Sequence, residues 1–112
     1  MYMKKRQANI NIDIVLNENN IPEEIFWQAS DSKIDRASAQ AFFLSFWDTD
    51  SKKSFNIDLW NKEMTMEEMK FFIFQSLLKM SSVLERSTGD ENLVKKMKEF
   101  SKQFGKMANV LK

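Results

Sequence analysis

Apolar and polar residues alternate along the first half of the chain, a pattern that indicates half-buried β-strands. Every second residue of Ile10–Leu16 is a large aliphatic residue, and asparagine and aspartate stand among the residues between them. The asparagines and the proline of residues 17–22 predict a turn, after which the alternation resumes over residues 25–29. Two further strands are predicted over Ala39–Asp48 and Ser54–Trp60. The pattern therefore predicts a four-stranded antiparallel meander.

The loop between the last two strands decides which of their side chains share a face. Residues 49–53 are polar and predict a five-residue hairpin loop, which would place Asp48 opposite Ser54. One face would then be almost wholly apolar, with Phe43, Trp47, Phe55, Ile57 and Leu59. The other face would carry Phe42, Leu44, Phe46 and Trp60 among Asn56 and Asp58.

The period changes to that of a helix after Thr65. Thr65 and Glu68 have the spacing of a capping box, and Gly89 is typical of a helix end. Asp90 can cap a second helix, and the apolar residues of that helix recur at spacings of four and three. They are Leu93, Met97, Phe100, Phe104, Met107 and Leu111. We therefore predict an α+β fold, a four-stranded antiparallel meander sheet followed by two C-terminal helices.

The size and composition of the chain limit its chemistry. With 112 residues, 43% of them hydrophobic, the chain is predicted to form a single globular domain over residues 1–112. It contains no cysteine and no histidine. Disulfides, thiolate metal sites, cysteine nucleophiles and the usual general base at neutral pH are therefore excluded.

The formal net charge of +1 is unevenly distributed along the chain. The first six residues and residues 91–112 are basic, and the segment between them is acidic. Lys95, Lys98, Lys102 and Lys106 follow one side of the second predicted helix, where they could meet an anionic partner or a membrane surface. Polar residues within 7–13 interrupt any apolar signal-peptide region, and no stretch is apolar enough to span a membrane. We therefore expect a cytoplasmic protein.

Acidic residues are the candidates for catalysis or metal binding. Asp48, Asp58, Glu23 and Glu24 could act in acid–base chemistry if burial raised the pKa of one of them. No nucleophile–base pair and no glycine-rich phosphate loop accompanies them, and residues 48–59 depart from the pattern of a calcium loop. We therefore predict that the protein is not an enzyme and needs no metal or cofactor.

Aromatic side chains on the second sheet face suggest a surface that acts by contact. Phe42, Phe46, Asp58 and Trp60, together with the four lysines of the second helix, form the candidate interaction surface. A covering helix, a second subunit or a protein partner could bury these rings, and single-stranded nucleic acid could stack on them. Asp58 would repel phosphates, and the lysines are not interleaved with the rings. Nucleic acid is therefore the less favoured partner.

The assembled motifs resemble the gliding motility-associated protein GldC family of Bacteroidetes-type bacteria. The resemblance rests on a Leu-Ser-x-Trp-Asp strand, an Ile-Asp-Leu-Trp strand and a helix that ends in Arg-x-Thr-Gly. In this chain the matching residues are Leu44, Ser45, Trp47, Asp48, Ile57–Trp60, Lys62, Met64, Met69, Lys70, Arg86, Thr88 and Gly89. Asn61 and Ser87 depart from the family pattern, which has threonine and alanine there.

The resemblance implies a small, non-catalytic accessory protein of gliding motility, associated with the machinery of type IX secretion. Its expected partners are proteins of the gliding machinery, with a homodimer and peripheral membrane contact as further expectations. The family carries no assigned site residues that could be transferred to this sequence.

Overall fold

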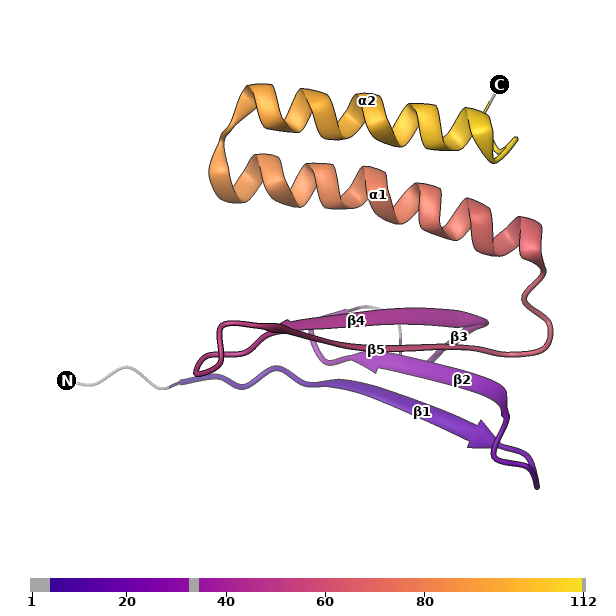
Figure 1. Cartoon of the computed structure of the whole chain (residues 1–112). Helices are drawn as coiled ribbons and strands as arrows, with labels where there is room; N and C mark the ends of the chain where they lie inside the picture. Colours follow the sequence, from indigo (N-terminus) through magenta and orange to yellow (C-terminus); the bar gives the residue numbers. More distant parts are fainter. Residues whose placement is uncertain (1–4, 33–34, 112) are drawn as a thin grey trace. The chain divides into compact units, whose positions relative to one another are not determined.

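The computed structural model describes residues 5–32 and 35–111 of the chain (Figure 1). It divides into two compact units, of which the first ends at Met64 and the second begins at Thr65. The single domain over residues 1–112 stays a prediction.

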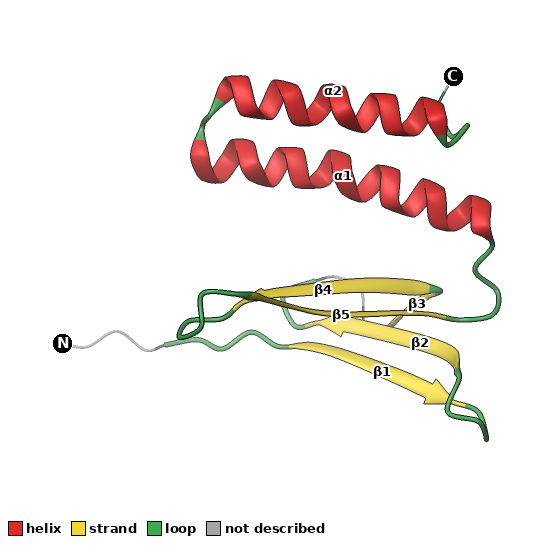
Figure 2. Cartoon of the chain, viewed as in Figure 1, coloured by secondary structure: helices red, strands yellow, loops and turns green. Residues whose placement is uncertain are grey.

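Among the described residues, the regular structure of the first unit is β-strand and that of the second is α-helix (Figure 2). The strands are β1 (Ile10–Leu16), β2 (Pro22–Ala29), β3 (Ala37–Ala39), β4 (Ala41–Trp47) and β5 (Ser54–Trp60). The first three form one antiparallel sheet in the order β1-β2-β3, and β4 pairs with β5 in a second sheet. The α+β class and the succession of antiparallel strands before two helices are confirmed.

The first sheet follows the predicted alternation. Ile12 lies opposite Trp27 and Ile14 opposite Ile25, so the apolar side chains of both strands share one face. Ile25 is almost completely buried and is the largest fully buried side chain of this unit. The turn before β2 depends on Asn17, whose side-chain oxygen accepts hydrogen bonds from the backbone N–H groups of Asn19 and Ile21.

The predicted third strand is interrupted at Gln40, where the chain bends between β3 and β4. Asn61 stabilises this joint, because its backbone N–H donates to the Gln40 carbonyl at 2.9 Å. Its side-chain amide donates to the Glu23 carbonyl at 3.2 Å, and its side-chain oxygen accepts from the backbone N–H of Glu63 at 3.1 Å. Asn61 is buried, and these bonds satisfy its amide. The residue that follows β5 thus ties both sheets together.

The second unit is a hairpin of two helices, α1 (Met66–Thr88) and α2 (Glu91–Met107). The predicted capping box is present: Thr65 accepts from the N–H of Glu68 at 3.0 Å, and Glu68 accepts from the N–H of Thr65 at 3.1 Å. Gly89 ends α1 in the left-handed conformation with φ of 67°. Asp90 caps α2 by accepting from the N–H of Leu93. These predicted helix ends are confirmed.

The two helices pack through small side chains. Ser81 of α1 and Ser101 of α2 are fully buried, and Val94 is nearly so. A Cβ atom on Gly105 would lie 2.7 Å from the Phe74 ring, so only glycine permits this close approach. The side of α2 that packs on α1 is therefore defined by Val94, Ser101 and Gly105. Half of the predicted apolar seam, namely Leu93, Phe100 and Met107, is exposed instead.

Candidate interaction surface

The β4–β5 hairpin has one face that is entirely apolar. The register places Phe46 opposite Phe55, Leu44 opposite Ile57 and Phe42 opposite Leu59, and directly opposed residues share a face. We call these six residues the hairpin face. Phe46, Phe55 and Ile57 are 55%, 56% and 52% exposed. A contiguous apolar surface of this kind is typical of a contact site.

The other face of the hairpin is mixed. Trp60 and Asp58 share it with Trp47 and Asn56, because Ala41 lies opposite Trp60 and Phe43 opposite Asp58. The predicted grouping of Phe42 and Phe46 with Asp58 and Trp60 is therefore wrong. Phe42 and Phe46 belong to the hairpin face, whereas Asp58 and Trp60 lie on the opposite side of the sheet.

The error comes from the length of the hairpin loop. The N–H of Asp48 donates to the Lys53 carbonyl at 2.8 Å, so residues 48 and 53 form the last pair and the loop has four residues, 49–52. Lys52 closes it with φ of 57°. The five-residue loop predicted from sequence shifted the register by one position, and such a shift moves every side chain of one strand to the other face.

Asp48, which directly precedes this loop, has a shifted pKa. The backbone N–H of Ser51 donates to Oδ2 of Asp48 at 2.8 Å. This bond, followed by the Ser51 hydroxyl, lowers the pKa of Asp48 below its usual value. A lowered pKa keeps the carboxylate charged, whereas a general acid needs a raised one.

Two of the candidate carboxylates, Asp48 and Asp58, do not form a pair. Asp58 lies opposite Phe43, five positions along the chain from Asp48, which is roughly 17 Å of extended strand. Within residues 5–32 and 35–111, no three acidic side chains are grouped closely enough to hold a metal ion.

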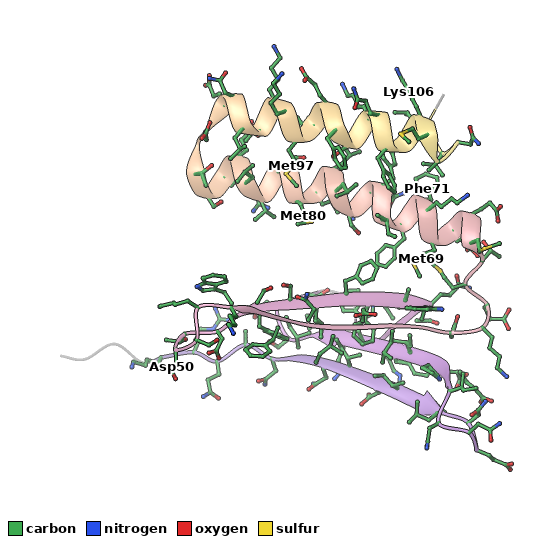
Figure 3. All side chains as sticks on the ribbon, viewed as in Figure 1. Asp50, Met69, Phe71, Met80, Met97 and Lys106 are labelled. Atoms are coloured by element: carbon green, nitrogen blue, oxygen red, sulfur yellow. The ribbon has the colours of Figure 1, made fainter. Side chains whose placement is uncertain are left out.

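The four lysines of the candidate surface belong to α2, in the other unit. Figure 3 shows Lys106 on the side of α2 that points away from α1, whereas Met97 points toward α1. The Nζ atom of Lys98 is 3.9 Å from the Glu85 carboxylate. Lys96, which is not one of the four candidate lysines, has its Nζ atom 3.6 Å from the Glu99 carboxylate. Acidic side chains thus accompany part of this basic helix, and exposed pairs of this kind contribute little to stability.

Neither α1 nor α2, which are the helices of the described part of the chain, combines the length and the apolar character that a membrane-spanning segment requires.

Comparison with known protein families identifies the family of this chain. Residues 22–110 match the family described as gliding motility-associated protein GldC-like. The chain belongs to the GldC-like family. The match extends from the first residue of β2 past the end of α2, so it includes the hairpin face and both helices. Neither the curated proteins nor the solved structures that were compared include one that matches this chain.

Membership of the GldC-like family associates the protein with gliding motility, as the motifs in β4, β5 and α1 predicted. Asn61, where the resemblance leads one to expect threonine, is the buried joint between the two sheets. The departure from the family pattern is visible in the sequence, but the role of Asn61 between the sheets was not predicted. A polar residue directly after an apolar strand is the signal that could have pointed to it.

Proposed function

We propose that this GldC-like protein is a non-catalytic accessory protein of gliding motility that binds a protein of the gliding machinery through the hairpin face. The observation that carries the proposal is the composition of that face. It holds three phenylalanines, two leucines and an isoleucine, and half of them are more than half exposed. We further propose that the protein acts in the cytoplasm.

The chemistry of the hairpin face fits a protein partner. Aromatic and large aliphatic side chains supply most of the binding energy at protein interfaces when a partner removes them from water. Phe46 and Phe55 lie directly opposite each other across the two strands and place two aromatic side chains next to each other on this face. The polar loop residues at one end of the hairpin, including Asp50 at the tip in Figure 3, supply a hydrated rim.

A non-catalytic role is supported by the state of the acidic residues. Asp48 is held in its charged form by Ser51, and the register separates it from Asp58. Neither arrangement matches the desolvated carboxylate that acid–base catalysis requires.

The experiment must distinguish a protein partner from a nucleic-acid partner. The corrected register removes Asp58 from the side of Phe42 and Phe46, which withdraws one argument against base stacking. However, β4 and β5 contain no lysine or arginine. Single-strand binders combine their aromatic platforms with cationic groups that follow the phosphates, and this combination is missing from both strands.

The test is affinity capture from lysate of a gliding bacterium, with and without nuclease. Phe46→Asp places a charge on the hairpin face, and Trp47→Asp is the matched control, since Trp47 is the next residue, is also exposed and lies on the opposite face. We expect the unmodified protein and Trp47→Asp to retain gliding-machinery proteins after nuclease. Phe46→Asp should reduce their recovery by about tenfold or more, the effect of losing about 1.4 kcal/mol. Equal recovery by both variants, or nuclease-sensitive recovery, would contradict the proposal.

A further inference from the structure

The outer edge of β5 is an unprotected strand edge. Within the described residues β5 pairs only with β4, and six of its seven residues are exposed. It contains no proline, no lysine and no register break, which are devices that protect an edge from pairing with another chain, and Asp58 is its one charged residue.

The other edges of the first unit are better protected. The register of β1 is broken between Val15 and Leu16, and β3 has only three residues. β4 continues directly from β3, and three of its seven residues are half-buried. Edge pairing is therefore most favourable at β5.

The hydrogen bonds at the two ends of the hairpin show which groups of β5 point outward. The Lys53 carbonyl accepts from Asp48, and the Asn61 N–H donates to Gln40. Backbone groups alternate in direction along a strand, so the odd-numbered residues of β5 bond to β4. The outward N–H and C=O groups consequently belong to Ser54, Asn56, Asp58 and Trp60.

We propose that the outer edge of β5 pairs antiparallel with the same edge of a second copy of this chain, with the two-fold axis at Ile57. This register matches the whole of β5 with itself and places Asp58 opposite Asn56 of the second copy. An axis at Asp58 would oppose two carboxylates directly, and an axis at Asn56 would leave Leu59 and Trp60 outside the strand pairing.

The pairing also completes a sheet that is small by itself. A two-stranded hairpin is marginally stable in water, whereas three or more strands with an apolar face are stable. Joining two copies at β5 produces the order β4-β5-β5-β4. Phe55 then lies opposite Leu59 of the second copy, so the hairpin faces of both copies become one continuous surface.

The natural absence of cysteine permits a direct test by oxidative cross-linking of the full chain. Ile57→Cys places the two sulfur atoms at the axis, in a pair whose Cα atoms are about 4.5 Å apart, within the range of a disulfide. We expect Ile57→Cys to form a disulfide-linked dimer. Phe55→Cys alone should not, because its copies are about 13 Å apart along the strands. A mixture of Phe55→Cys and Leu59→Cys should cross-link.

A second pair of variants tests the edge without new sulfur atoms. Asn56→Pro removes an outward N–H and leaves the bonds to β4 in place, whereas Asn56→Ala keeps that N–H. Sedimentation velocity should show a dimer for the unmodified chain and for Asn56→Ala. For Asn56→Pro the dissociation constant should rise by about tenfold or more. Circular dichroism confirms that each variant is folded.

A monomeric unmodified chain would overturn the proposal, as would a dimer that does not cross-link through Ile57→Cys. Failure here is distinguishable from failure of the proposed function. Asn56→Pro affects the β5 edge, and Phe46→Asp affects a side chain of β4 on the hairpin face.

Discussion

Phe46 lies directly opposite Phe55 across the β4–β5 hairpin, and both rings are more than half exposed. This pairing follows from the sheet register that the four-residue loop sets, and the same register determines the composition of both faces. Four apolar neighbours continue the same face, and the charged residue of β5, Asp58, falls on the other side. An exposed aromatic pair within an apolar face is the feature that the proposed function depends on.

The first prediction concerns this register. A double-mutant cycle with Phe46→Ala and Phe55→Ala should give a coupling energy of about 0.5 kcal/mol in urea unfolding, since opposed aromatic residues interact. The control cycle combines Trp47→Ala with Phe55→Ala, residues on opposite faces, and should give no measurable coupling. Coupling between Trp47 and Phe55 alone would instead support the register of a five-residue loop and contradict this prediction.

The second prediction concerns the joint between the sheets. Asn61→Ala leaves the Glu23 carbonyl and the Glu63 N–H without their partner, and should lower the free energy of unfolding by about 1–3 kcal/mol. Asn61→Thr, the residue expected from the family pattern, lacks an amide and should lose stability as well. Asn56 is an exposed residue of the same unit, so Asn56→Ala should alter the free energy of unfolding by less than about 0.5 kcal/mol. Equal stability of the Asn61 and Asn56 variants would contradict the bridging role.

The third prediction concerns the helical hairpin. Gly105→Ala would normally favour a helix by about 1 kcal/mol, but its Cβ would lie within 2.7 Å of the Phe74 ring. We expect a net loss of about 1–2 kcal/mol from overpacking. In a Phe74→Leu background the same change should become neutral or stabilising. If Gly105→Ala were stabilising in the unmodified chain, the helices could not be this close.

The fourth prediction concerns pH. The folded-state pKa of Asp48 is lowered, so its stabilising effect is present above the unfolded pKa and is lost as the pH falls through the folded pKa. Asp48→Ala should therefore be less stable than the unmodified chain at neutral pH, and the difference should shrink in acid. Urea unfolding at several pH values measures this. A difference that grows as the pH falls would contradict the lowered pKa.

Much of the fold follows from local sequence patterns. The alternation of Ile10–Leu16, the Thr65–Glu68 capping box and Gly89 each act over a few residues, and the structure contains all three. The prediction of which β4 residues share a face was also correct, because alternation along a strand does not depend on the partner strand.

The relation between strands was not predictable in the same way. The four-residue loop requires Lys52 to adopt a left-handed conformation, which lysine rarely does. A glycine or asparagine at this position would have indicated such a loop, but the sequence has neither there. The helix interface was missed for a related reason. Ser81, Ser101 and Gly105 are buried because they are small, and a search for apolar periodicity passes over them.

The division of the predicted third strand has a long-range cause. Gln40 and its alanine neighbours read as part of a continuous strand. The bend coincides with the hydrogen bonds from Asn61, a residue twenty-one positions later in the chain. Contacts at that separation are not visible in a local pattern.

The most direct test of the hairpin face as a contact site is photo-cross-linking in gliding cells. A photoreactive amino acid is placed at Phe46 in one strain and at Trp47 in a second strain, since these neighbouring residues lie on opposite faces. We predict a covalent adduct with a protein of the gliding machinery from the Phe46 position and none from the Trp47 position. Adducts from Trp47 alone, or from neither position in cells that glide normally, would contradict the account.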